Sequence, residues 1–193
     1  MVNYCADREL LRRSRGASAI NAEVTMLIIF GGLPGSGKTT IARALAERLN
    51  AVHVRVDTIE QAIRASGIAD DAGPAGYIAA YGIAGDNLTL GRTVIADSVN
   101  PLRITRSAWL SVAQAAGVAA AEIEIVCSDK AEHRNRVETR LTDVEGLVKP
   151  TWEDISERAY DEWHDATVID TASKTVDAVL DELVSRLKSL AMR

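Results

Sequence analysis

The chain has 193 residues and a formal net charge of −5, and 47% of its residues are hydrophobic and 25% charged. One domain of this length could bury about 70% of the surface that its unfolded form exposes. The acidic balance argues against a protein that coats duplex nucleic acid, because neutralising phosphates requires clustered Lys and Arg. The apolar stretch at residues 26–33 is far shorter than the roughly 20 residues that span a bilayer, which argues against a membrane anchor.

The N-terminal segment and the cysteines bear on organisation and location. Residues 1–25 carry several arginines and two acidic side chains before residue 10, but they lack the apolar middle region of a signal peptide. We expect them to form a loosely attached extension ahead of a domain at residues 26–193, and translation could begin at Met26. Cys5 and Cys127 lie far apart without metal-binding spacing, which favours the reducing cytoplasm.

Short apolar or β-branched runs alternate with amphipathic segments along the chain. The runs are typical of buried strands and occupy residues 26–30, 52–56, 93–97, 122–127 and 167–170. Between them, apolar residues recur with a period of about 3.6, which predicts helices. These helices span residues 38–49, 58–66, 104–116, 131–141, 152–163 and 175–190.

This alternation predicts right-handed crossovers and an α/β fold, in which helices cover both faces of one parallel sheet. Ligands then gather at the carboxyl ends of the strands. Residues 67–85 and 142–150 are rich in Gly, Asp and Pro and have weak periodicity, so we expect loops there, above that edge. The sequence contains no internal repeat, which favours a single domain.

The segment Gly32–Thr39 matches the pattern G-x-x-x-x-G-K-[ST], directly after the first predicted strand and at the start of the first predicted helix. In that position successive backbone N–H groups and the helix dipole can bind a phosphate. A glycine-rich turn beside a surface lysine would need no such position, so we reject that alternative. The residues expected to contact ATP are Gly32, Leu33, Pro34, Gly35, Ser36, Gly37, Lys38, Thr39 and Thr40.

Two side chains of this motif, Lys38 and Thr39, and a third side chain farther along the chain, Asp97, have the types that phosphoryl transfer requires. The Lys38 ammonium would lie between the β- and γ-phosphates, and the Thr39 hydroxyl would bind Mg²⁺. Asp97 ends the predicted strand at residues 93–97 and has the form of a Walker B aspartate, which holds Mg²⁺ directly or through water. The alternative for Asp97 is a simple cap after that strand.

A second aspartate, Asp57, follows the predicted strand at residues 52–56 and precedes a predicted helix. Its carboxylate could cap that helix. Alternatively, it could accept the proton of an acceptor hydroxyl lined up with the γ-phosphate, or position the acceptor. No motif in the sequence decides between these roles.

Two arginines, Arg136 and Arg140, are spaced i, i+4 and therefore lie on one face of the helix predicted at residues 131–141. A guanidinium brought in by a closing lid would stabilise the charge that phosphoryl transfer spreads over the equatorial oxygens. Taken alone, the pair is equally typical of a solvated helix face, because Glu138 offers a local partner.

The order of these features resembles that of the small P-loop kinases of the nucleoside-monophosphate-kinase-like group, over about residues 26–190. The group includes gluconate, adenylylsulfate and shikimate kinases and chloramphenicol phosphotransferase. The phrases at residues 150–155 and 160–163 are similar to those of uncharacterised AAA-type kinases in the group. The resemblance implies a three-layer α/β/α fold whose five-stranded parallel sheet has the order 2-3-1-4-5.

The resemblance also implies an ATP-dependent kinase with a hydroxyl or phosphate acceptor, and we expect the acceptor group to be a hydroxyl of a small molecule. It implies a lid near residues 128–150, in which Arg136 stacks on adenine and Arg140 reaches the phosphates, and an adenine site bordered by residues 171–174. One departure concerns the acceptor: adenylate-type kinases have an arginine where this chain has Glu60, which disfavours a mononucleotide. The candidates for binding an anionic acceptor are Arg64, Arg92, Arg103 and Arg106.

Two other functions stay open at this point. A polynucleotide 5′-hydroxyl kinase is similar in its P-loop and strand-end aspartate, although the acidic net charge counts against it. A nucleotide-dependent regulatory switch would bind ATP without any acceptor. The sequence has no guanine-reading NKxD segment, so a GTPase is disfavoured.

Overall fold

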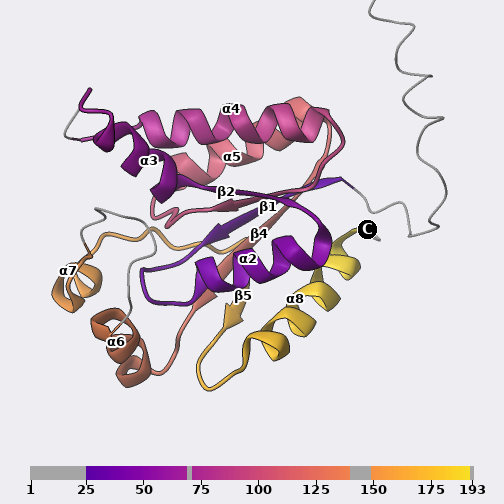
Figure 1. The fold of residues 1–193 in the computed structure, drawn as a ribbon. Coiled ribbons are helices and arrows are strands. Elements are labelled where there is room, and N and C mark those ends of the chain that lie inside the picture. Colours follow the sequence, from indigo (N-terminus) through magenta and orange to yellow (C-terminus); the bar gives the residue numbers. More distant parts are fainter. Residues whose placement is uncertain (1–24, 69–70, 140–148, 192–193) are drawn as a thin grey trace, which may run out of the picture.

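The computed structural model describes residues 25–68, 71–139 and 149–191 as strands and helices around one sheet (Figure 1). The strands are β1 (Met26–Gly31), β2 (Val52–Arg55), β3 (Val94–Asp97), β4 (Ala119–Val126) and β5 (Thr167–Asp170). The helices are α2 (Lys38–Leu49), α3 (Val56–Ala65), α4 (Ala75–Thr89), α5 (Arg103–Ala116), α6 (Lys130–Thr139), α7 (Trp152–Ser156) and α8 (Val176–Ala191).

The five strands are parallel and lie in the order β2-β3-β1-β4-β5, which confirms the predicted fold class. All residues of the central strand β1 are buried. Phe30 of β1 and Arg55 of β2 both lie in register with Asp97 of β3, so the side chains of these three residues emerge on the same face of the sheet. The carboxyl ends of the strands therefore form one edge.

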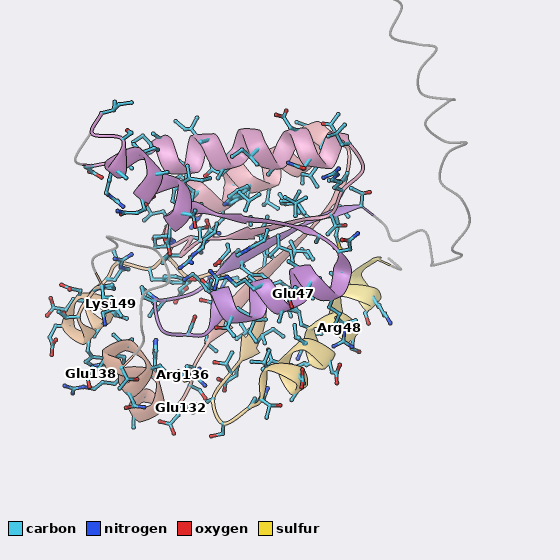
Figure 2. The ribbon with its side chains drawn as sticks, in the orientation of Figure 1. Glu47, Arg48, Glu132, Arg136, Glu138 and Lys149 are labelled. Atoms are coloured by element: carbon cyan, nitrogen blue, oxygen red, sulfur yellow. The ribbon has the colours of Figure 1, made fainter. Side chains whose placement is uncertain are left out.

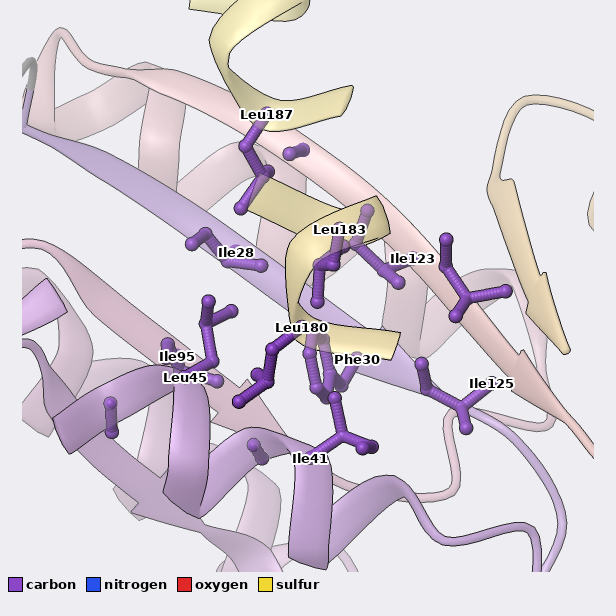
Figure 3. Packing of buried hydrophobic residues seen from close by; sticks show 14 of the residues in the cluster. Ile28, Phe30, Ile41, Leu45, Ile95, Ile123, Ile125, Leu180, Leu183 and Leu187 are labelled. Carbon is purple, nitrogen blue, oxygen red and sulfur yellow. The ribbon is translucent and has the colours of Figure 1, made fainter. Parts of the chain in front are cut away.

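Aliphatic side chains fill the face of the sheet that α2 and α8 cover (Figure 3). Ile28 and Phe30 of β1 pack with Leu45 of α2 and Leu183 of α8, and none of the four side chains is exposed to solvent. Burying each of them contributes about 1.5–3 kcal/mol relative to leaving it exposed. This packing fixes α2, and with it the glycine-rich loop, against the sheet.

Smaller side chains lie on the opposite face, which α4 and α5 cover (Figure 1). Leu27 and Ile29 of β1 meet Ala80 and Ala84 of α4 and Trp109 of α5. The two alanines are completely buried, so the backbone of α4 lies close to its neighbours. The single large indole of Trp109 fills the remaining space.

The prediction of a loop at residues 67–85 was wrong, because most of this segment belongs to α4. The helix is built largely from Ala and Gly, and its Ile78 is 63% exposed while Ala80 is buried, so apolar periodicity does not reveal its inner face. Burial of small residues against the sheet stabilises this helix instead.

Three boundaries also differ from the prediction. The helix expected at residues 152–163 ends at Ser156, and the strand expected from residue 122 begins at Ala119 because it pairs with Met26 of β1. Val56 starts α3 rather than ending β2. Within the described ranges, no helix has both the length and the apolar character needed to cross a membrane.

Candidate functional site

The loop between β1 and α2 requires glycine at particular points. Gly32, Gly35 and Gly37 have φ values of 136°, 84° and 95°, which side chains rarely adopt. A Cβ atom on Gly32 would lie 2.2 Å from the carbonyl oxygen of Ile125, and one on Gly35 would lie 2.5 Å from Cγ2 of Val137. The glycines therefore let the loop pass between α2, β4 and α6.

The N-terminus of α2 can bind an anion. Its N-cap residue is Gly37, and no side chain caps the helix, so backbone N–H groups of the first turn stay available to a ligand. Lys38, Thr39 and Thr40 of this turn line a cavity of about 560 Å³, which is the size of an ordinary ligand site.

Cations dominate the lining of this cavity. It extends from the P-loop and α2 to the ends of β2 and β5, α6 and the start of α8, and its described lining contains no carboxylate. The five charged side chains that line it are those of Lys38, Arg43, Arg55, Arg136 and Lys174. Such a concentration of positive charge favours a polyanion such as a nucleotide polyphosphate.

Asp97 does not line the cavity itself but lies next to Lys38 and Thr39, which do, and it is 1% exposed. Although burial opposes ionisation, the pKa of Asp97 is lowered by the hydrogen bond from His53, by the charge of Lys38 and by the Thr39 hydroxyl. His53 Nε2 lies 3.1 Å from Oδ2 of Asp97. Oδ1 of Asp97 makes no hydrogen bond within the described residues, so one buried carboxylate oxygen remains for a cation or a water molecule.

The sequence analysis missed His53. Its side chain lies on β2, beside β3 in the sheet, and it holds one oxygen of Asp97 so that the orientation of the carboxylate is fixed. A histidine within a short β-branched strand carries no signal by itself, and only the β2–β3 pairing brings it to Asp97.

Asp57 lies in the first turn of α3 and not at the N-cap, which is Arg55. Oδ2 of Asp57 is 3.6 Å from Nη2 of Arg55, whose side chain lines the cavity. The carboxylate is 30% exposed. A capping role for Asp57 therefore has no geometric support, and the carboxylate lies beside the β2 end of the cavity.

Helix α6 lies against the outer side of the glycine-rich loop. His133 Nε2 is 2.9 Å from the carbonyl oxygen of Pro34, and the His133 ring meets the Trp152 ring of α7 edge-on at 5.3 Å. Figure 1 shows α6 and α7 together at the N-terminal end of α2. These contacts connect the loop with the helices on both sides of residues 140–148.

Arg136 of α6 is held at the β5 end of the cavity. It donates hydrogen bonds to Oγ1 (2.8 Å) and the carbonyl oxygen (3.1 Å) of Thr171, and it pairs with Glu132 one turn earlier on the same helix (Figure 2). The Thr171 hydroxyl contacts the carbonyl oxygen of Ser36 at 2.8 Å. Arg136 thus joins β5 to the loop, whereas Arg140 lies outside the described residues.

Arg106, one of the candidates for anion binding, is committed to the protein backbone. It is 3% exposed and donates hydrogen bonds to four carbonyl oxygens, at 2.7–3.2 Å. Those oxygens belong to Asn100, Pro101, Asp161 and Glu162. Its guanidinium carbon also lies 4.5 Å from the centre of the Trp163 ring. This arginine therefore positions the chain after α7 and is not available to a ligand.

The Trp163 ring supports the beginning of the glycine-rich loop. A Cβ atom on Gly31 would lie 2.3 Å from Cζ3 of Trp163, so only glycine permits this approach. Trp163 Nε1 donates a 2.9 Å hydrogen bond to Glu122, whose pKa is raised by burial. Arg106 and Trp163 together hold residues 161–163 at the carboxyl edge of the sheet.

Carboxylates gather on the side of the site formed by α3 and α4. Burial and the charges of Asp57 and Asp71 raise the pKa of Glu60, against the opposite effect of Arg64. Burial chiefly raises the pKa of Tyr77 as well, and Glu60 and Asp57 add to the shift. Arg64 is 3.5 Å from Glu60, so this second anion-binding candidate is engaged in an ion pair. This side is thus more acidic than the cavity.

The sequence profile of the family AAA_33, described as an AAA domain, matches residues 27–161. The chain belongs to this AAA domain family. No curated protein sequence matches the chain.

Solved structures similar to this AAA domain include kinases. A candidate kinase from Chloroflexus aurantiacus has a TM-score of 0.67 at 21% identity, over 86% of this chain and 97% of that one. The adenylylsulfate (APS) kinase CysC of Mycobacterium tuberculosis, in complex with AMPPNP and APS, has a TM-score of 0.65 at 18% identity, over 86% and 98%. A gluconokinase from Sinorhizobium meliloti has a TM-score of 0.61 at 19% identity, over 88% and 95%. The AAA domain therefore has the fold of P-loop kinases.

Proposed function

We propose that this AAA domain is an ATP-dependent kinase that transfers the γ-phosphate to a hydroxyl of a small-molecule acceptor in the cytoplasm. The observation that carries the proposal is the cationic cavity over the glycine-rich loop, with the buried Asp97 next to its Lys38 and Thr39 and with Asp57 beside its β2 end. A regulatory ATP-binding protein would need the cavity but would have no use for a second carboxylate beside it.

The residues of the cradle fit a magnesium nucleotide. The Thr39 hydroxyl and the open Oδ1 of Asp97 would hold Mg²⁺ together with phosphate oxygens, and the bound ion would neutralise charge on the phosphates. The described residues contain no cluster of three or more His, Cys, Asp and Glu side chains that could hold a metal ion without the nucleotide. This donor set suits Mg²⁺, which usually keeps several water and phosphate ligands.

Each charged side chain then has one task. Backbone N–H groups of the loop and of the first turn of α2 that have no partner within the protein bind the β-phosphate, and the Lys38 ammonium neutralises the charge that develops between the β- and γ-phosphates. Arg136, held at its edges by Thr171 and Glu132, presents its guanidinium plane for stacking on the base. In this proposal Arg140 reaches the phosphates from the lid.

Asp57 acts on the acceptor. Its carboxylate accepts the proton of the acceptor hydroxyl as that oxygen attacks the γ-phosphorus, and ADP leaves. The neighbouring Glu60, Asp71 and Tyr77 give the acceptor side hydrogen-bonding groups and negative charge. An acceptor that is rich in hydroxyls fits these groups better than one that carries phosphate.

The test is acceptor-dependent ADP release, measured with purified protein, Mg²⁺-ATP and a panel of sugars, nucleosides, antibiotics and 5′-hydroxyl oligonucleotides. We expect one class of small hydroxyl compound to accelerate ADP release and to become phosphorylated, and Lys38→Ala to abolish both. Stimulation by oligonucleotides alone would identify a polynucleotide kinase instead. Slow hydrolysis that no acceptor changes would indicate a regulatory switch and would overturn the proposal.

A further inference from the structure

Arg55 is a cation of the nucleotide cavity that no sequence motif marks. It is the last residue of β2, its side chain is 11% exposed, and it lines the cavity together with Thr39 and Thr40. Because it lies in register with Asp97 of β3, it emerges on the same face of the sheet as the Walker B carboxylate. The ion pair with Asp57, at 3.6 Å, links the guanidinium to the acceptor side.

The order of the strands distinguishes the two ends of the cavity, one at β5 and the other at β2. β5 and β2 are the two edges of the sheet, and β1, which leads into the glycine-rich loop, lies between them. At the β5 end the lining consists of Arg136, Thr171 and the start of α8, including the apolar Val176 and Val179, which suits a base. In the proposed function the β-phosphate would lie over the loop itself. The chain of phosphates would then extend from there towards β3 and β2, and its last member would come nearest to Arg55.

We propose that Arg55 binds the terminal phosphate of a nucleoside triphosphate, from the edge of the sheet opposite to the α6 side of the cavity. The inference deepens the proposed function by adding a second arginine at the phosphoryl group that is transferred. A guanidinium can form two parallel hydrogen bonds with phosphate oxygens, and in a partly buried site these bonds are strong.

This assignment distinguishes Arg55 from the other cations. Lys38 contacts the β-phosphate as well as the γ-phosphate, so its loss weakens the binding of diphosphates too. Arg136 lies at Thr171, at the base end, and does not distinguish ATP from ADP. A cation at the β2 end is expected to recognise the third phosphate without contacting the base or the β-phosphate.

The experiment measures dissociation constants of Mg²⁺-AMPPNP and Mg²⁺-ADP for the full chain and for Arg55→Gln. We expect Arg55→Gln to weaken AMPPNP binding by about tenfold or more, which corresponds to about 1.4 kcal/mol, and ADP binding by less than about twofold. Arg55→Lys should lie between Arg55→Gln and the unchanged protein, because lysine keeps the charge without the paired hydrogen bonds. Thermal unfolding of each variant checks that the fold is intact.

Two control variants sharpen the result. Arg48→Gln also removes an arginine, but Arg48 pairs with Asp181 at 2.7 Å outside the cavity lining, so neither nucleotide should bind differently. Asp57→Asn removes the ion pair but keeps Arg55, so the ratio of AMPPNP to ADP affinity should stay within about twofold. Equal weakening of both nucleotides by Arg55→Gln, or no weakening, would overturn the inference. These binding measurements contain no acceptor. A failure to find kinase activity would therefore contradict the proposed function, but it would not change the conclusion about Arg55.

Discussion

The proposed phosphate cradle at residues 32–40 and the proposed acceptor side, formed by α3 and α4, differ in how their groups are held. The cradle is fixed by backbone conformation, by the contact of His133 with Pro34, and by the packing of α2 on β1. The acceptor side consists of partly exposed carboxylates that pair with nearby arginines, as Asp57 does with Arg55. The cradle is therefore preorganised for one ligand. On the acceptor side, by contrast, substitution of a few side chains would be enough to alter which acceptor binds.

The largest effect is expected in the cradle. Lys38→Ala should lower turnover by roughly three orders of magnitude or more, because the ammonium neutralises charge that develops at the transferred phosphate. The fold should survive, and thermal unfolding with circular dichroism checks this. If a folded Lys38→Ala protein releases ADP at the normal rate, the cradle is not the site of catalysis. The contrast between a phosphate cradle and an acceptor side would then be wrong.

The next largest effect is expected for Asp57, where loss of transfer activity without loss of ATP affinity would distinguish the acceptor side from the cradle. Asp57→Asn keeps the shape of the side chain but removes its charge, so phosphorylation of the acceptor should fall by about 10² to 10⁴. ATP affinity should hardly change, because the loop donors, Lys38 and Thr39 remain. Single-turnover transfer and equilibrium nucleotide binding measure the two quantities separately. Full transfer activity in Asp57→Asn would show that Asp57 does not take part in the transfer reaction.

A buried arginine outside the cavity, Arg106, holds the segment after α7 at the carboxyl edge of the sheet. Arg106→Met leaves four backbone carbonyl oxygens without their donor, which should lower the free energy of unfolding by about 2–4 kcal/mol. For a domain of this size the midpoint of thermal unfolding should fall by about 5–15 °C. Arg92→Met is the control, because Arg92 is exposed. Equal midpoints for the two variants would show that Arg106 does not hold residues 161–163.

The smallest effect is expected at the base end of the cradle. Arg136→Ala should weaken binding of ATP and of ADP alike, by about fivefold to twentyfold, because the lost stacking concerns the base and not a phosphate. The turnover number should change less than the affinity. Titrations of both nucleotides, followed by steady-state kinetics at saturating ATP, test this. A loss of affinity confined to ATP would show that Arg136 contacts the phosphates and not the base.

The cradle was readable in the sequence because its function requires glycines and one lysine at fixed spacing. Gly32, Gly35 and Gly37 each meet a backbone condition that other residues rarely satisfy, and the strands around them are continuous apolar runs. The structure places Asp97, buried, at the end of β3 as the sequence predicts, since an apolar run that ends in aspartate is conspicuous, and its role at the metal stays a prediction.

The remaining parts depend on contacts between distant residues. His53 reaches Asp97 only through the pairing of β2 with β3, and Arg106 reaches residues 161 and 162 only through the folded chain. Helix α4 was not predicted because three of its four buried residues are alanine or glycine, which periodicity does not distinguish from a loop. All three features depend on tertiary structure, which a pattern of single residues does not record.

Helix α8 has a consequence for the order in which the protein can assemble during translation. The face of the sheet that carries α2 is closed by Val179, Leu180, Leu183 and Leu187, all near the end of the chain. Ribosomes make proteins from the N-terminus at about 5–20 residues per second, so the glycine-rich loop exists several seconds before these leucines emerge. Until then Ile41 and Leu45 have only their partners on the sheet and lack those on α8, so the packing that fixes α2 is incomplete. The nascent chain is therefore expected to acquire its affinity for nucleotide only after its last helix has left the ribosome.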